Sequence, residues 1–208
     1  MITSTAMAAL EKESEAQGIT KRSLMENAGA GIYKVLKDRF SLKDKRILVV
    51  CYHGNNGGDG LVAARYLAKE CAVDVLFLGD EEKFKPDARE YFEKIIDKPG
   101  IFVVNDYAEM DFGQYDIIID AIFGTGIKGA LSSQLIEVIH LINSTDAFKV
   151  SIDIPSGMDP DTGKVNGVAV EPNLIICMHD LKKGLAALKE KTVIVDIGIP
   201  KEIYTKMA

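Results

Sequence analysis

Several features of other protein classes are scarce or absent in this sequence. It contains only three cysteines, Cys51, Cys71 and Cys177, each within or beside an apolar run and with no CxxC pair. This disfavours a disulfide framework or a zinc site, so we interpret the cysteines as small buried residues of a reducing compartment. No apolar run approaches the roughly 20 residues of a membrane span, and residues 1–18 resemble neither a secretory signal nor a transit peptide. We therefore expect a cytoplasmic location and no membrane contact.

Positive charge is also scarce. The 25 lysines and arginines are outnumbered by 31 acidic residues, which gives a net charge of -6. That balance disfavours nucleic acid as a partner, although a local site could still hold a small anion. The P-loop pattern GxxxxGK[ST] is missing, which disfavours a P-loop kinase or ATPase. We find no internal repeat, low-complexity tract or linker, so we predict one domain over residues 1–208.

The hydrophobic pattern alternates between strand and helix from Lys45 onward. Several predicted strands are continuous apolar runs, as in a sheet that is covered on both faces. We therefore predict an α/β fold, a three-layer αβα sandwich with a Rossmann-like, mostly parallel sheet and two extra N-terminal helices. The predicted helices are 2–17, 20–40, 58–69, 87–96 and 132–142, and the predicted strands are 46–52, 72–78, 101–104, 115–122, 148–152, 174–178 and 192–196.

A glycine-rich stretch, HGNNGGDG at 53–60, joins the first predicted strand to a helix. We expect its glycines to adopt positive φ and to let the backbone approach a ligand, as at many anion sites of α/β proteins. Residues 58–63 also fit the dinucleotide pattern GxGxxA, with Asp80 about twenty residues on. A conventional NAD-dependent dehydrogenase therefore stays an alternative, although several polar residues separate the pattern from the strand.

Two further strands end in unusual polar sequences, DAIFGTGIKG from Asp120 and DIPSGMD from Asp153. Because the carboxyl ends of parallel strands meet at one edge, we expect the three strand ends to form one site. Asp120 either belongs to that site or caps a neighbouring helix. Asp153 is either a general acid or base or a satisfied turn carboxylate. Residues 124–126 offer N–H groups for a phosphate, which Lys128 would assist unless it is an ordinary surface lysine.

Six segments in this order resemble the NAD(P)H-hydrate epimerase family, the N-terminal domain of YjeF proteins. They are LMENAG at 24–29, residues 54–60, DAIFGTG at 120–126, SIDIPSG at 151–157, KGL at 183–185 and DIGIP at 196–200. The resemblance implies a Rossmann-like homodimer that interconverts the R and S forms of hydrated NADH and NADPH, called NADHX and NADPHX. An S-specific dehydratase then restores the cofactor. Many bacterial members carry that dehydratase as a second domain, so these residues are either a stand-alone epimerase or a part of such a fusion.

The resemblance also implies roles for individual residues. Asp153 is the expected catalytic residue and contacts the reacting end of the substrate. One potassium ion per subunit is expected on Asn56, Asp120 and Ser156, whose oxygens suit a hard monovalent cation. A non-catalytic nucleotide-binding or protein-interaction module on the same fold stays open. The remaining substrate contacts are expected from Asn55, Asn56, Gly57, Gly58, Asp59, Gly124, Thr125, Gly126, Ile127, Lys128, Gly129 and Ala130.

Overall fold

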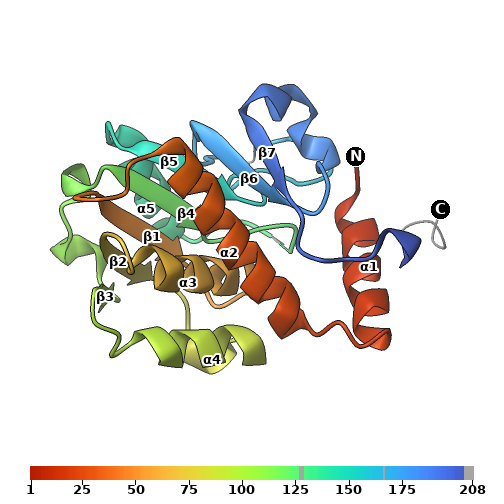
Figure 1. Ribbon diagram of the computed structural model, residues 1–208. Coiled ribbons are helices and arrows are strands. Elements are labelled where there is room, and N and C mark those ends of the chain that lie inside the picture. The colour runs from red at the N-terminus through yellow and green to blue at the C-terminus, as the bar shows by residue number, and fades with distance from the viewer. Residues whose placement is uncertain (127–128, 166, 204–208) are drawn as a thin grey trace.

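The computed structural model describes residues 1–126, 129–165 and 167–203. Seven strands form one sheet in the order β3-β2-β1-β4-β5-β6-β7, and all six neighbouring pairs are parallel (Figure 1). The predicted α/β fold is confirmed, with a sheet that is wholly parallel. The strands are β1 (Arg46–Cys51), β2 (Ala72–Phe77), β3 (Ile101–Val104), β4 (Ile117–Ala121), β5 (Phe148–Ile152), β6 (Leu174–Met178) and β7 (Thr192–Val195).

Helices cover both faces of the sheet. In Figure 1, α2, α3 and α4 lie side by side over one face and α5 lies behind the other. The helix α1 stands apart from these layers, near the last residues of the described chain. The α-helices are α1 (Ser4–Ala16), α2 (Lys21–Arg39), α3 (Asn55–Leu67), α4 (Pro86–Ile95) and α5 (Ser133–Ser144). The 3-10 helices are η1 (Glu81–Lys83), η2 (Tyr107–Glu109), η3 (Phe112–Gln114) and η4 (Lys183–Lys191).

Strand β1 shows why the sheet strands read as continuous apolar runs. Ile47 and Val49 point into the core beneath α2 and α3, whereas Leu48 and Val50 belong to the core beneath α5. All four side chains are fully buried. A strand that is covered on both faces needs apolar residues at every position, because successive side chains point to opposite faces.

Two glycines inside α2 allow close packing against protein rather than ligand. A Cβ on Gly29 would collide with the side chain of Val62 on α3, and one on Gly31 would collide with Val195 of β7. Glycine in a helix interior costs about 1 kcal/mol relative to alanine, and here that cost is offset by burial of α2 against its neighbours.

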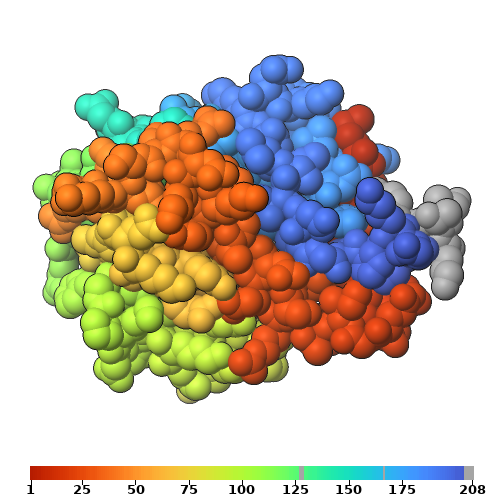
Figure 2. Space-filling model, viewed as in Figure 1, coloured from red at the N-terminus to blue at the C-terminus, as the bar shows by residue number. Residues whose placement is uncertain are grey.

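The two ends of the described chain meet beside the sheet. The backbone N–H of Ile2 donates to Leu181 at 2.8 Å, and Asn27 of α2 donates to the carbonyl of Ile197 at 2.8 Å. In Figure 2 the red N-terminal helix and the blue C-terminal residues accordingly form one continuous surface. No helix among the described residues is long and apolar enough to cross a membrane.

Candidate functional site

A cavity of about 670 Å³ lies at the carboxyl ends of β1, β4, β5 and β6. The segments that follow β1 and β4 line it, together with α1, the start of α2, Asp153 after β5, and Met178 and Lys182 at the end of β6. Its volume is within the roughly 300–1,000 Å³ of small-molecule sites. Strands β1 and β4 are neighbours whose onward connections run to opposite sides of the sheet. This switch point is where open α/β sheets bind ligands.

The glycine-rich stretch after β1 is helix rather than loop. Helix α3 begins at Asn55, three residues before the predicted start, and none of the glycines in 53–60 has a positive φ. A Cβ on Gly58 would stand 2.5 Å from the sulfur of Met25, and one on Gly60 would stand 2.5 Å from the Cβ of Ala121. The prediction of positive φ is therefore wrong, because these glycines permit close packing of α3.

The first turn of α3 still offers free backbone donors to the cavity. Its N-cap, Gly54, makes no side-chain capping bond, and Gly58 is the first residue whose N–H bonds within the helix, at 3.1 Å to Gly54. The N–H groups of Asn55, Asn56 and Gly57 are therefore left for other acceptors, as at any helix start. Such a helix start attracts anions. Of the predicted contacts in this stretch, Asn55, Asn56 and Asp59 line the cavity, and Gly57 and Gly58 lie buried behind them.

The segment after β4 is divided between the cavity wall and the exterior. Gly124, Thr125 and Gly126 line the cavity. Gly129 and Ala130 are exposed and do not line it, whereas Ile127 and Lys128 lie outside the described residues. The predicted phosphate-binding role of Lys128 consequently stays a prediction.

Gly124 brings two polar groups of the site together. A Cβ at this position would stand 3.0 Å from Asp153 Oδ2 and 3.2 Å from Asn56 Oδ1. Asn56 is 8% exposed, and its Nδ2 has no hydrogen-bond partner in the described chain. A buried amide donor without a partner is costly in a folded protein and points to a group that binds there.

Asp120 is buried and accepts four hydrogen bonds. Its Oδ1 accepts from Ser156 Oγ at 2.5 Å and from the N–H of Ile122 at 3.3 Å, and its Oδ2 accepts from Ser151 Oγ at 2.8 Å and from the N–H of Ser156 at 2.9 Å. Burial raises the pKa of Asp120, and these hydrogen bonds oppose that rise only in part. The partners come from β5 and from the segments after β4 and β5. The helix-capping alternative for Asp120 is therefore wrong.

Asp153 adopts an uncommon backbone conformation directly after β5. Its φ is 65°, in the left-handed region, which costs a non-glycine residue on the order of 1 kcal/mol. Its backbone N–H donates to Ile176 at 2.8 Å. The side chain is held at both oxygens, by the N–H of Met178 to Oδ1 at 3.4 Å and by the N–H of Thr125 to Oδ2 at 3.3 Å. The carboxylate therefore stands between the ends of β4 and β6.

Lys182 is a site residue that sequence reasoning missed. It is fully buried, donates from Nζ to the carbonyl of Met178 at 2.6 Å and forms an ion pair with Asp153 Oδ1. Burial alone would lower the pKa of Lys182, but its charge and hydrogen-bond interactions with Asp153 and Cys177 together outweigh burial and raise the pKa above its ordinary value. The only signal in the sequence is its position directly before KGL at 183–185, since a lysine beside another lysine otherwise indicates surface.

Two more carboxyl groups face the same cavity. Burial raises the pKa of Asp59 well above its ordinary value, and the negative charges of Asp153 and Glu11 add to this effect. No described residue donates a hydrogen bond to Asp59. Burial and the charge of Asp153 likewise raise the pKa of Glu11, which α1 contributes and which was not predicted. The cavity therefore disfavours further negative charge except near the start of α3.

The arrangement that a dehydrogenase needs is not formed around Asp80. The GxGxxA pattern at 58–63 lies inside α3 rather than at its entrance. The Asp80 carboxylate caps η1 and pairs with Lys83 at 2.9 Å, and it does not line the cavity. His53 Nδ1 accepts a hydrogen bond from the N–H of Asp80 at 3.1 Å. This histidine therefore supports the segment that follows β2.

The fold and the position of the cavity define a class. This is a doubly covered parallel α/β domain with a ligand-sized cleft at the switch point, the arrangement in which such domains bind nucleotides. Residues 21–184 match the family model described as YjeF-related protein N-terminus. The chain belongs to this family, as its sequence resemblance predicts.

Individual relatives agree with the family. The chain is 36% identical over 208 residues to the NAD(P)H-hydrate epimerase of Nitrosopumilus maritimus, covering 97% of this chain and 96% of the relative. It is 39% identical to the bifunctional NAD(P)H-hydrate repair enzyme Nnr of Methanopyrus kandleri, covering 96% of this chain but only 42% of that relative. A crystal structure of yeast ynu0 superposes with a TM-score of 0.86 at 22% identity and covers 100% of this chain and 93% of that chain, which supports the fold.

Proposed function

We propose that this protein is an NAD(P)H-hydrate epimerase, which interconverts the R and S forms of NADHX and NADPHX at C6 of the nicotinamide ring. The observation that carries this proposal is the 36% identity to a relative of that name along almost its whole length. The site adds chemical support, because Asp153 lines a cavity of small-molecule size that the start of α3, with its free N–H donors, also lines. The activity is the one that the sequence resemblance predicts.

The chemistry requires a proton carrier near C6. In the hydrate, C6 bears a hydroxyl next to the ring nitrogen, and inversion requires that the stereocentre open and close again. Either loss and return of water or opening and closing of the ring moves a proton at the C6 oxygen. Asp153 is the residue we assign to that proton transfer, with the phosphates of the substrate at the start of α3 and along residues 124–126.

A coupled assay tests the activity. R-NADHX is mixed with an S-specific dehydratase, and the return of NADH absorbance is followed with and without this protein. We expect recovery faster than the spontaneous rate, in proportion to the amount of protein added. Unchanged recovery at high protein concentration would reject the epimerase and favour the non-catalytic nucleotide-binding module.

We also propose one potassium ion per subunit, held by oxygens of Asn56, Asp120 and Ser156. Amide, carboxylate and hydroxyl oxygens are the ligands of a hard cation. No group of three His, Cys, Asp or Glu side chains suited to a metal occurs in the described part of the chain. Ser156 Oγ accepts from the N–H of Phe123 at 2.9 Å, and a Cβ on the next residue, Gly124, would stand 3.2 Å from Asn56 Oδ1. The segment after β4 therefore lies close to two of the three proposed ligands. A cation there would neutralise a carboxylate whose burial is costly.

Removal of potassium tests this site without reference to activity. We expect a Tm higher by a few degrees in potassium chloride than in tetramethylammonium chloride of equal ionic strength, because an ion that binds only the folded state stabilises it. Asn56→Leu should remove the difference between the salts, and Asn55→Leu, one position earlier and exposed, should keep it. Equal Tm values for the wild-type protein in both salts contradict the site.

The remaining assignments rest on the family resemblance. They are a homodimer, a functional link to an S-specific dehydratase and a cytoplasmic location. The bifunctional Methanopyrus relative supports the link, because its name describes a repair enzyme and it is more than twice as long as the matched region. Sedimentation equilibrium of the purified protein tests the dimer, and a monomer at micromolar concentration would exclude it.

A further inference from the structure

The two carboxylate oxygens of Asp153 have different surroundings. Oδ1 is bound by the Lys182 ammonium and by the N–H of Met178 at 3.4 Å. Oδ2 accepts only from the N–H of Thr125, at 3.3 Å, among the described residues, and it lies against Gly124 in the cavity wall. A ligand that displaces the long hydrogen bond from Thr125 can therefore approach Oδ2. Oδ1 is already occupied by the Lys182 ammonium and the N–H of Met178.

Lys182 is itself held in place. Its Nζ is anchored by the carbonyl of Met178, and its backbone pairs with Ile2, where the N–H of Lys183 donates to Ile2 at 3.0 Å. A fully buried lysine loses its hydration. The free energy of that desolvation destabilises the fold unless a counter-charge and hydrogen bonds compensate for it. Rigid support of an ammonium beside one carboxylate oxygen is the arrangement expected of a group that orients that carboxylate.

Lys182 supplies the positive charge beside Asp153 in a cavity that acidic side chains also line. Glu11 and Asp59 line the same cavity, and burial raises the pKa of both carboxyl groups above their ordinary values. Among the described residues, Lys182 is the cation in contact with Asp153. The titratable groups that face the pair are Glu11 of α1, Asp59 of α3, Cys177 of β6 and His179 after β6.

We propose that Lys182 is a positioning residue for Asp153: it fixes Oδ1 and leaves Oδ2 as the oxygen that exchanges the proton with the C6 oxygen. The inference rests on the proposed epimerase activity. In this role Lys182 acts through Asp153.

The pH dependence of kcat in Lys182→Met and Lys182→Gln tests this role. Without the adjacent positive charge a carboxylate holds its proton more tightly, so the acidic limb of kcat should move to higher pH. We expect kcat at pH 7 to fall at least about tenfold, with much of the loss recovered as the pH rises. KM should change by less than about threefold, because the groups proposed to bind the substrate in its ground state are unchanged.

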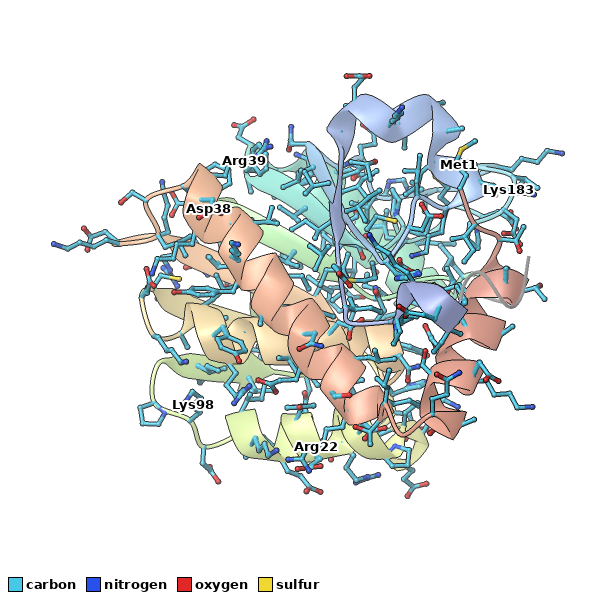
Figure 3. All side chains as sticks on the ribbon, turned by 45° about the vertical axis from the view of Figure 1, so that its right-hand side comes forward. Met1, Arg22, Asp38, Arg39, Lys98 and Lys183 are labelled. Carbon is cyan, nitrogen blue, oxygen red and sulfur yellow. The ribbon has the colours of Figure 1, made fainter. Side chains whose placement is uncertain are left out.

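Lys183→Met is the matched control. It makes the same chemical change one position on, at an exposed residue beside Met1 on the outside of the molecule (Figure 3). We expect its kcat and pH profile to equal those of the wild type. A uniform loss of kcat in the Lys182 variants with an unmoved acidic limb would show mere structural support and overturn the proposal. A raised KM with an unmoved limb would instead make Lys182 a substrate ligand, which also overturns it.

The remaining outcomes are Lys182 variants that do not fold and a wild-type protein that is inactive. If neither Lys182 variant folds, ¹³C NMR of the Asp153 carboxyl in the wild-type protein decides: an ionised group at pH 6 supports the proposal and a protonated one overturns it. If the wild-type protein itself has no activity, the proposed function fails and this inference fails with it. Active wild type with an unmoved limb in Lys182→Met rejects the inference alone.

Discussion

Replacement of Asp153 by asparagine is expected to lower kcat for epimerisation by about 10³-fold or more, with little change in KM. An amide has nearly the same shape as a carboxylate but cannot accept and return a proton, and general acid–base groups contribute roughly 10²–10⁴-fold to rates. The substitution leaves unchanged the cavity walls at the start of α3 and along residues 124–126, where we propose that the rest of the dinucleotide binds. The coupled assay with R-NADHX measures the effect, and near-normal turnover in Asp153→Asn would exclude Asp153 as the proton carrier.

The same substitution removes the counter-charge of a buried lysine. Breaking one half of a buried ion pair costs about 3–5 kcal/mol, so Asp153→Asn should also lower Tm. The double variant Asp153→Asn with Lys182→Met removes both charges and should regain much of that stability while it stays inactive. This pair of variants separates loss of chemistry from loss of fold. Recovery of activity in the double variant would show that the single variant failed only through instability.

Substitution of Gly57 by alanine is expected to lower the free energy of unfolding by about 3 kcal/mol or more. A variant that does not fold at all would also agree with this prediction. A Cβ at this position would stand 1.8 Å from the carbonyl oxygen of Tyr52. The obstacle is backbone just after β1, which cannot move aside without displacing α3 from the sheet. Urea denaturation of Gly57→Ala against the wild type measures the effect.

Gly54 provides the control within the same stretch. It is the N-cap of α3 with φ −89°, and a Cβ there would meet no atom within 4 Å. Gly54→Ala should therefore change the free energy of unfolding by no more than about 1 kcal/mol, the usual scale of an N-cap substitution. Similar destabilisation in both variants would contradict the view that Gly57 is required by its contact with the strand.

The close packing of α3 also shapes the proposed site. The glycines that bring α3 close to β1 and β4 also place the first N–H groups of the helix at the cavity. Asn56 and Asp153 meet across Gly124 for the same reason. With Glu11 and Asp59 lining the same cavity, the helix start is the part of this wall best suited to an anionic group.

The sequence by itself determined the order of strands and helices and the location of the site. Continuous apolar runs identify strands that are buried on both faces, and a polar residue that interrupts such a run stands out. Asp120 and Asp153 were found in this way, because each is a carboxylate among isoleucines, and parallel strands must present their ends at one edge. That rule needs no knowledge of side-chain contacts.

Only the tertiary structure decided what the individual groups contact. Lys182 lies 29 positions after Asp153 in a segment that resembles surface sequence, and nothing local shows that its side chain turns inward to Oδ1. Glu11 reaches the same cavity from α1. The glycines of 53–60 predict positive φ and close approach to a ligand when the sequence is read alone. In the structure a side chain at Gly57, Gly58 or Gly60 would instead collide with Tyr52, Met25 or Ala121. Local patterns specify elements, whereas burial and charge pairing depend on atoms that folding brings together from distant parts of the chain.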